Sequence, residues 1–190
     1  MKKVIIIRVC EIFLKGKNRS YFTSLLEEHI KKALMGINYG FEKMQMRYLV
    51  EDFDEIDYDE IIERLKKVCG IHTLSPAYAV ASSRENIAEC AIELCKDKSG
   101  TFKIETNRAD KTFPLHSVEL SALVGGDVLT RFGGKLSVDV KKPDFTVNVD
   151  IRENGKSLIF TDYIKGIGGM PTGSSGKGFL MLSGGIDSPV

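Results

Sequence analysis

The first part of the chain changes its hydrophobic period twice, from that of a strand to that of a helix and back. Residues 4–10 are apolar and β-branched, which is typical of a strand. Apolar side chains then recur at helical spacing over residues 22–34, and Gly36 follows as a residue type that commonly ends a helix. Residues 43–50 indicate a second strand. The pattern therefore predicts a β-α-β unit, followed by an acidic stretch over residues 51–60.

The middle of the chain repeats this alternation of helical and strand patterns. A helix near Ile61 that ends at Gly70 precedes a strand over residues 74–80. Ser82-Ser83-Arg84-Glu85 then reads as a capping box that opens the next helix. Asn154-Gly155 predicts a hairpin, because both turn residues accept a positive φ. The remaining predicted elements are strands over residues 101–107, 145–151 and 158–163 and a helix capped by Ser117.

The last residues form a strand-and-loop pattern suited to a phosphate ligand. Residues 179–182 are all apolar, as in a buried parallel strand, and they follow a Gly-rich segment over residues 165–176. The strand leads into Ser-Gly-Gly-Ile-Asp-Ser at residues 183–188, where glycines let the main chain approach an anion. The Walker A and dinucleotide fingerprints are both excluded, because Pro171 stands where each requires glycine.

Composition narrows the class of protein. The 190 residues are 43% hydrophobic, which is enough for a buried core and excludes bulk disorder. No apolar run reaches the roughly 18–20 residues that span a bilayer, and the N-terminal run has no signal-peptide cleavage site. We therefore expect a cytoplasmic protein without membrane contact. The cysteines form no CxxC pair and the histidines lack metal-ligand spacing, so we expect buried reduced thiols and no metal site.

Charge is distributed unevenly along the chain. The formal net charge is +1, but residues 1–50 carry a net +6 and residues 51–100 a net −6. Such asymmetry suggests separate faces or domains, and the basic part is compatible with an anionic partner. Charge alone favours the simpler interpretation, which is a solvated basic helix face.

Motifs at residues 11–19, 106–114, 139–144, 147–152, 168–177 and 183–188 together resemble the bacterial tRNA 4-thiouridine synthetase family. The loop at residues 183–188 is similar to the pyrophosphate loop of N-type ATP pyrophosphatases, which adenylate an oxygen and release pyrophosphate. Residues 168–177 are similar to the family's joining segment. Residues 106–114 are similar to the core of a THUMP domain, the family's RNA-binding module, and residues 139–144 with 147–152 are similar to its closing strands. Residues 11–19 are similar to its N-terminal ferredoxin-like segment, so the resemblance covers nearly the whole chain in the family's order.

The resemblance implies an α+β fold in four parts. Residues 1–58 would form a small ferredoxin-like domain packed with an α/β THUMP domain of residues 59–165. Residues 166–178 would be a Gly-rich linker. Residues 179–190 would be the first strand and loop of a truncated ATP pyrophosphatase domain. We therefore expect a piece of the enzyme that is inactive alone, with no catalytic residue, no metal ligand and no cysteine in the family's sulfur-handling role.

For the intact protein the resemblance implies an ATP-dependent tRNA uridine 4-sulfurtransferase. ATP with Mg²⁺ would adenylate O4 of a tRNA uridine, and persulfide sulfur from a cysteine desulfurase would displace AMP to give 4-thiouridine. The family analogy also suggests a homodimer and a second role in thiamine thiazole synthesis. The alternative is a non-catalytic THUMP RNA-binding module that serves a different RNA-modifying activity. A chain of that class is not expected to carry the Ser-Gly-Gly-x-Asp-Ser loop.

The resemblance also assigns candidate binding residues. The ATP-binding candidates are Met181, Leu182, Ser183, Gly184, Gly185, Asp187 and Ser188. Lys and Arg supply the salt-dependent attraction to RNA phosphates, and the tRNA acceptor end is the expected partner. The RNA-binding candidates are Lys15, Lys17, Arg19, Arg108, Lys111, Lys141 and Lys142. We interpret Phe113 as a buried aromatic rather than a base-stacking group, and Asp110 as a residue that orients Arg108 or Lys111.

Overall fold

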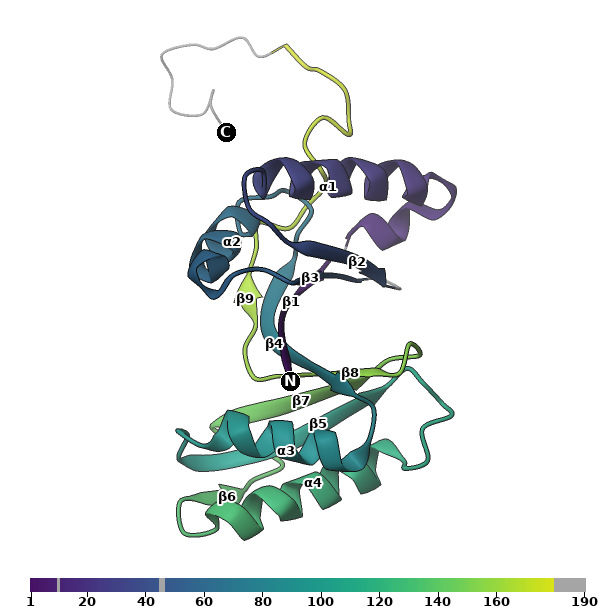
Figure 1. Ribbon diagram of the computed structural model, residues 1–190. Coiled ribbons are helices and arrows are strands. Elements are labelled where there is room, and N and C mark those ends of the chain that lie inside the picture. The colour runs from purple at the N-terminus through teal and green to yellow at the C-terminus, as the bar shows by residue number, and fades with distance from the viewer. Residues whose placement is uncertain (10, 45–46, 180–190) are drawn as a thin grey trace.

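The computed structural model describes the chain except residues 10, 45–46 and 180–190, with the backbone alone at residues 13–15 and 17 (Figure 1). Its described strands form one nine-stranded sheet in the order β2-β3-β1-β4-β8-β7-β5-β6, with β9 paired to β4. The β5–β6 and β5–β7 pairs are parallel, and the other pairs are antiparallel. The elements are β1 (Lys2–Arg8), η1 (Glu11–Asn18), α1 (Arg19–Ala33), β2 (Gly40–Met44), β3 (Arg47–Glu51), η2 (Glu55–Asp57), α2 (Tyr58–Leu65), β4 (Thr73–Ala81), α3 (Arg84–Cys95), β5 (Gly100–Arg108), α4 (Ser117–Phe132), β6 (Leu136–Val138), β7 (Phe145–Ile151), β8 (Lys156–Phe160) and β9 (Ile164–Lys165).

Strand β1 lies at the centre of the first half of the sheet. It pairs with β3 on one side and β4 on the other, and Val4, Ile5, Ile6 and Ile7 are all fully buried. Ile5 and Ile7 belong to the core beneath the helices, whereas Val4 and Ile6 belong to a cluster on the opposite face. A strand that is covered on both faces has a continuous apolar run rather than an alternating one.

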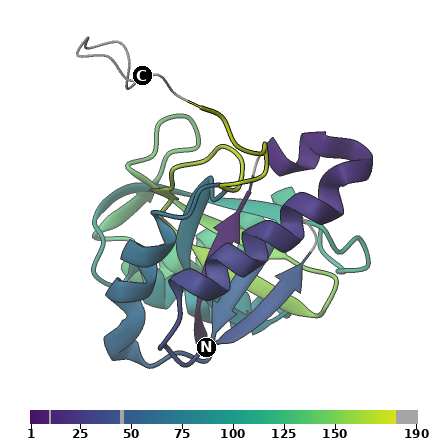
Figure 2. The same ribbon diagram turned by 90° about the horizontal axis from the view of Figure 1, so that it is seen from above.

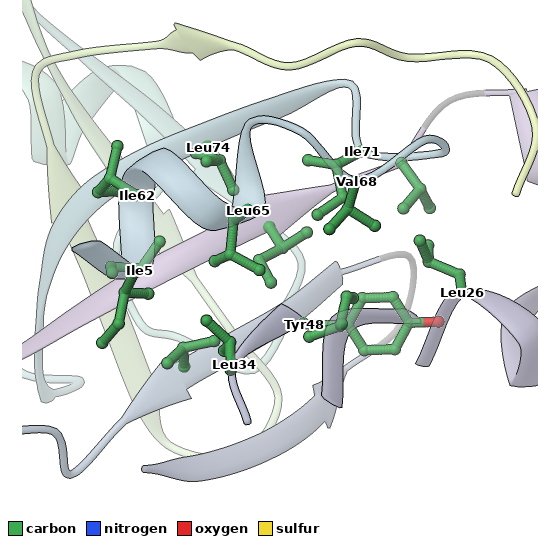
Figure 3. Close-up of a cluster of buried hydrophobic side chains, with 14 of the residues drawn as sticks. Ile5, Leu26, Leu34, Tyr48, Ile62, Leu65, Val68, Ile71 and Leu74 are labelled. Carbon is green, nitrogen blue, oxygen red and sulfur yellow. The ribbon is translucent and has the colours of Figure 1, made fainter. Parts of the chain in front are cut away.

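The first core lies between helices α1 and α2 and the strands beneath them. Leu26 and Leu34 from the α1 region meet Leu65 of α2, Ile5 of β1 and Leu74 of β4 (Figure 3). Figure 2 shows α1 lying across the strands of this half. The predicted domain boundary after residue 58 falls inside α2, which begins at Tyr58 and packs within this first core.

The second core lies beneath α3 and α4. Ile87 of α3 and Val124 of α4 pack against Phe102 of β5 and Val149 of β7. Strand β5 alternates as predicted, since Phe102 and Ile104 belong to this core while Glu105 is exposed. Period-two alternation places the intervening side chains of β5 and β7 on the opposite face of the sheet.

The two halves of the sheet curve so that their inner faces meet. Leu49 of β3 lies in one buried cluster with Leu158 and Phe160 of β8. Arg47 of β3 forms an ion pair with Asp150 of β7, although three strands separate β3 from β7 in the sheet order. Contact between these faces therefore holds the two halves together in addition to the ladder.

Strand β4 belongs to both halves. Residues 73–79 pair with β1, and residues 78–81 pair with β8. The backbone ladder therefore runs without interruption from the first half of the sheet to the second (Figure 1).

The α+β fold is confirmed, with differences in its details. His116 rather than Ser117 is the N-cap residue of α4, and β8 ends at Phe160 rather than at residue 163. Asn154 and Gly155 form the predicted turn between antiparallel β7 and β8, with Gly155 at φ 72°. The single strand predicted over residues 43–50 is wrong, because β2 and β3 pair antiparallel there as a hairpin. Ser83 rather than Ser82 caps α3, and its hydroxyl accepts the Asn86 N–H at 3.2 Å. Within the described residues, no helix has the length and apolar character needed to cross a membrane.

Candidate nucleic-acid interface

Three of the basic candidates lie at the start of the first helical region. Lys15 and Lys17 fall in η1, where the structure describes the backbone alone. Arg19 begins α1 and is exposed. The predicted contact of these residues with RNA stays a prediction.

Arg108 stabilises a loop of its own domain. Its side chain is partly buried at the end of β5, and its Nη1 donates to the carbonyls of Phe113 at 2.9 Å and Leu115 at 2.7 Å. The neighbouring Lys111 is exposed and donates from Nζ to the Arg108 carbonyl at 2.8 Å. Arg108 therefore closes the loop over residues 109–115, a role that the sequence pattern did not indicate.

The structure also gives the surroundings of Asp110 and Phe113, the acidic and the aromatic residue of this loop. The Asp110 carboxylate accepts hydrogen bonds from the Thr112 hydroxyl and N–H, which lower its pKa. Its hydrogen bonds go to Thr112, and the Arg108 charge also lowers the pKa of Asp110, so the interpretation that Asp110 orients Arg108 or Lys111 stays a prediction. Phe113 is 7% exposed, which confirms the interpretation of a buried aromatic side chain.

Lys141 and Lys142 lie in the loop between β6 and β7. Their backbone N–H groups donate to Asp139 at 2.8 and 3.0 Å, which fixes the loop and lowers the pKa of the Asp139 carboxyl. Both side chains are exposed, and neither has an ion-pair partner in the part of the chain that the structure describes. They are the candidates best placed to meet an RNA phosphate.

The basic candidates of the second half do not form one cluster. The loop that carries Lys142 meets the start of β5, where the Asp144 N–H donates to the Thr101 carbonyl at 2.9 Å. Arg108 and Lys111 lie at the other end of that strand. Seven residues of extended chain separate Thr101 from Arg108, which is about 23 Å. Any RNA that contacts both groups must span the length of β5.

A basic hollow that the sequence analysis did not identify lies between α1 and the end of α2. It has a volume of about 340 Å³ and is lined by His29, Lys32, Lys67, Cys69 and Thr172, among others. Lys32 and Lys67 have no ion-pair partner among the described residues. Both lysines lie near helix C-termini, which favour cations, so the helix dipoles are sufficient to account for them.

The centre of the molecule holds a buried cluster of arginines between the two halves of the sheet. Asp150 is 2% exposed and accepts from Arg47, while Arg152 Nη1 lies 3.6 Å from it and Asn107 Nδ2 donates to it at 3.0 Å. Burial lowers the pKa of Arg47, and the Asp150 charge opposes that shift. The cluster therefore holds the inner faces together through one shared carboxylate.

Arg8 extends this cluster towards the surface. Burial lowers its pKa to about 10, with Arg47 contributing, so Arg8 is charged at neutral pH. Its Nη1 donates to the Ser75 hydroxyl at 2.8 Å, and its guanidinium lies 4.6 Å from the Phe160 ring centre and 4.8 Å from that of Tyr163. Its buried Nη2 has no hydrogen-bond partner among the described residues. The two rings supply the favourable electrostatic contact instead.

The ATP-binding candidates cannot be placed, because Met181 to Ser188 lie outside the described residues. The preceding Phe179 is fully exposed. Among the described residues, no group of three His, Cys, Asp or Glu side chains could hold a metal ion.

Comparison with known families matches both halves of the fold. A family model described as the ThiI ferredoxin-like domain matches residues 4–75, and a THUMP domain model matches residues 81–161. The first match extends through α2 into β4, in agreement with the packing of α2 in the first core.

Curated relatives and solved structures extend this likeness to the whole chain. A probable tRNA sulfurtransferase of Acetivibrio thermocellus is 44% identical over all of this chain and 50% of its own length. One from Alkaliphilus metalliredigens is 43% identical over all of this chain and 49% of its own. A 4-thiouridine synthetase solved with RNA and bound ATP is 34% identical with a TM-score of 0.80, over 100% of this chain and 48% of that one. TrmN of Thermus thermophilus, at 18% identity and a TM-score of 0.55, shares the fold alone.

The fold and the matched segments define a ferredoxin-like domain joined to a THUMP domain. The chain belongs to the tRNA sulfurtransferase, or 4-thiouridine synthetase, family and corresponds to its N-terminal part. It spans about half the length of the curated relatives that it matches.

Proposed function

We propose that this chain is the tRNA-binding part of an ATP-dependent tRNA sulfurtransferase. The observation that carries the proposal is the match of the whole chain, at 34% identity and a TM-score of 0.80, to a 4-thiouridine synthetase that was solved with RNA. The exposed Lys141 and Lys142, which have no ion-pair partner among the described residues, support it, because such cations attract phosphate without first breaking an internal ion pair.

In the intact protein the reaction would proceed in two steps. The uridine O4 attacks the α-phosphorus of ATP, and pyrophosphate leaves. In the second step the outer sulfur of a persulfide, supplied by a cysteine desulfurase, attacks C4 of the uridine, and AMP leaves with the original oxygen. A thiol then attacks the inner sulfur, so that the S–S bond breaks, the outer sulfur stays on C4 and a disulfide forms. ATP and Mg²⁺ belong to this proposal through the resemblance of residues 183–188 to a pyrophosphate loop. A homodimer, a cytoplasmic location and a role in thiamine thiazole synthesis belong to it through family analogy.

The binding part of the proposal is tested by titrating the chain with tRNA and with heparin at two salt concentrations. We expect tRNA to bind more tightly than heparin at both, with an affinity that falls as salt rises because phosphate contacts release counterions. Equal weak binding to both polymers would remove the assignment to tRNA. The full-length protein, assayed for 4-thiouridine in tRNA with and without ATP, tests the sulfur-transfer part and separates it from a purely RNA-binding role.

A further inference from the structure

The segment that follows β8 returns to the first half of the molecule and is attached there. Strand β9 pairs antiparallel with β4 at Thr73 and Leu74. Three backbone hydrogen bonds of 2.8 to 2.9 Å then join residues 166–168 to residues 70–72, which precede β4. These partners all lie within residues 4–75, the part that matches the ferredoxin-like domain. The chain that leaves the THUMP domain is therefore bonded to the ferredoxin-like domain (Figure 1).

Side chains of the same segment pack on the first core. Ile164 and Met170 lie against that core, and Pro171 is buried. A Cβ added to Gly70 would lie 3.1 Å from Leu26 Cδ1 of α1 and 3.4 Å from Pro171 Cγ, so the proline ring lies close to the backbone at the end of the α2 region. The attachment therefore extends as far as Pro171.

Gly166 is the residue on which the close approach of the two main chains depends. A Cβ at this position would lie 2.4 Å from the Ile71 carbonyl oxygen and 3.1 Å from the Ile71 carbonyl carbon. Both are backbone atoms, so they cannot rotate aside as the end of a side chain can. Glycine permits this approach because it has no Cβ. Any other residue at position 166 has to move the segment away from residues 70–72.

Beyond Pro171 the chain comes away from the first half. The Ser174 N–H donates to the Pro171 carbonyl at 3.1 Å in a turn, and residues 175–179 are all exposed. Ser183 is the first residue of the loop that resembles a pyrophosphate loop. It follows Pro171 by 12 residues, whereas it follows Phe160, the last residue of β8, by 23. The attachment therefore about halves the length of chain between the folded domains and that loop.

We propose that Gly166 and Pro171 are positioning residues for sulfur transfer, because they make the ferredoxin-like domain the point from which the catalytic half of the protein extends. The effective concentration at the end of a flexible tether falls roughly as the −3/2 power of its length, so doubling the length lowers it about threefold. A fixed starting point also sets orientation, and misplacement of reacting groups by about 1 Å can cost about 100-fold in rate. This inference rests on the proposed function, and it gives the ferredoxin-like domain a role that is separate from RNA binding.

The test compares two variants of the full-length protein that both have about twice the normal length of free chain. Gly166→Ala should release the attached segment. An insertion of Gly and Ser residues after Ser175 doubles the free length and leaves the attachment intact. In both variants kcat for 4-thiouridine formation in tRNA should fall at least about threefold, while the affinity for tRNA stays that of the wild type. Gly178→Ala is the matched control and should change neither quantity, because no atom lies within 4 Å of a Cβ there.

Hydrogen exchange at the Gly70 and Gly168 amides reports on the attachment itself. Both amides donate to carbonyls across it, so both should be protected in the wild type and should exchange faster in Gly166→Ala. The amides of β7, in the other half of the sheet, should stay protected. Unchanged exchange at Gly70 and Gly168 in this variant would refute the attachment.

Unchanged kcat would overturn the positioning role, either in Gly166→Ala with the segment released or in the insertion variant. A fall in kcat that is matched by an equal loss of tRNA affinity would also overturn it, because the residues would then act on RNA binding. The insertion variant decides the question if Gly166→Ala does not fold. Wild-type protein that forms 4-thiouridine while both variants keep its kcat refutes this inference alone. Wild-type protein that forms none refutes the proposed function and this inference with it.

Discussion

Removing the Asp150 carboxylate should destabilise the whole molecule, because it leaves two arginines without their shared partner. The Asp150 side chain is 3% exposed, and those of Arg47 and Arg152 are 19% and 11% exposed. Breaking a buried ion pair costs roughly 3–5 kcal/mol. Since both arginines keep some contact with water, we expect Asp150→Ala to lower the free energy of unfolding by about 3 kcal/mol, at the lower end of that range.

Urea denaturation followed by circular dichroism measures this loss. With a urea dependence of about 2–3 kcal/mol per molar, the midpoint should fall by about 1 M. A double-mutant cycle of Arg47→Ala and Asp150→Ala should give a coupling energy of about 1–3 kcal/mol. The control cycle uses Lys96 and Glu93, whose side chains are 62% and 53% exposed and which should couple by about 0.5 kcal/mol or less.

The reasoning fails if Asp150→Ala costs no more than loss of the exposed pair. It also fails if the variant unfolds in two transitions while the wild type unfolds in one. The first result would mean that the arginines reach solvent without cost. The second would mean that the ion pair, rather than the continuous sheet, couples the two halves.

Three further outcomes are expected. Gly100→Ala should lower stability by about 1–3 kcal/mol in urea titrations, because Gly100 has φ 100° and an added Cβ would lie 2.5 Å from Asp144 Oδ2. Arg108→Ala should speed hydrogen exchange over residues 109–115, because two hydrogen bonds from a charged donor are lost; unchanged exchange would refute its role in closing the loop. Burial raises the pKa of Cys90 to about 12 and of Cys95 to about 11, whereas unfolded thiols ionise near about 8.5. The unfolded state therefore loses protons that the folded state keeps, so stability should be complete below about pH 8.5 and should fall between pH 9 and 11. The fall in the urea midpoint from pH 8 to pH 10 should be smaller in a Cys90→Ala variant, and equal wild-type midpoints at the two pH values would contradict the prediction.

Local sequence patterns were enough to predict most elements of the fold. The apolar run of β1, the helical spacing in α1 and the Asn154-Gly155 turn each depend on neighbours within a few residues. The hairpin of β2 and β3 was missed because Gln45 and Met46, which join them, are not typical turn residues. Where a turn carries its own chemical signal, as at Asn154-Gly155, the sequence shows it.

The candidate site was less predictable, because it depends on contacts between distant strands. Nothing near Arg47 indicates that it meets Asp150, which is 103 residues away. The contact between Arg8 and Tyr163 is equally inconspicuous in the sequence, since it exists only when β1 and β8 share one sheet with β4 between them. The sequence indicated Arg108 as an RNA-binding candidate. Only the structure shows that its side chain donates hydrogen bonds to the carbonyls of Phe113 and Leu115.

Strand β4 pairs with strands of both domains, and this limits how the two domains can be exchanged between proteins. A cut between them would sever a strand that carries hydrogen bonds for both, and each piece would expose an unpaired edge prone to aggregation. The smallest unit that can be transplanted intact is therefore the pair. Because β4 joins the two domains, a ligand bound to one domain is held at a fixed orientation relative to the other domain.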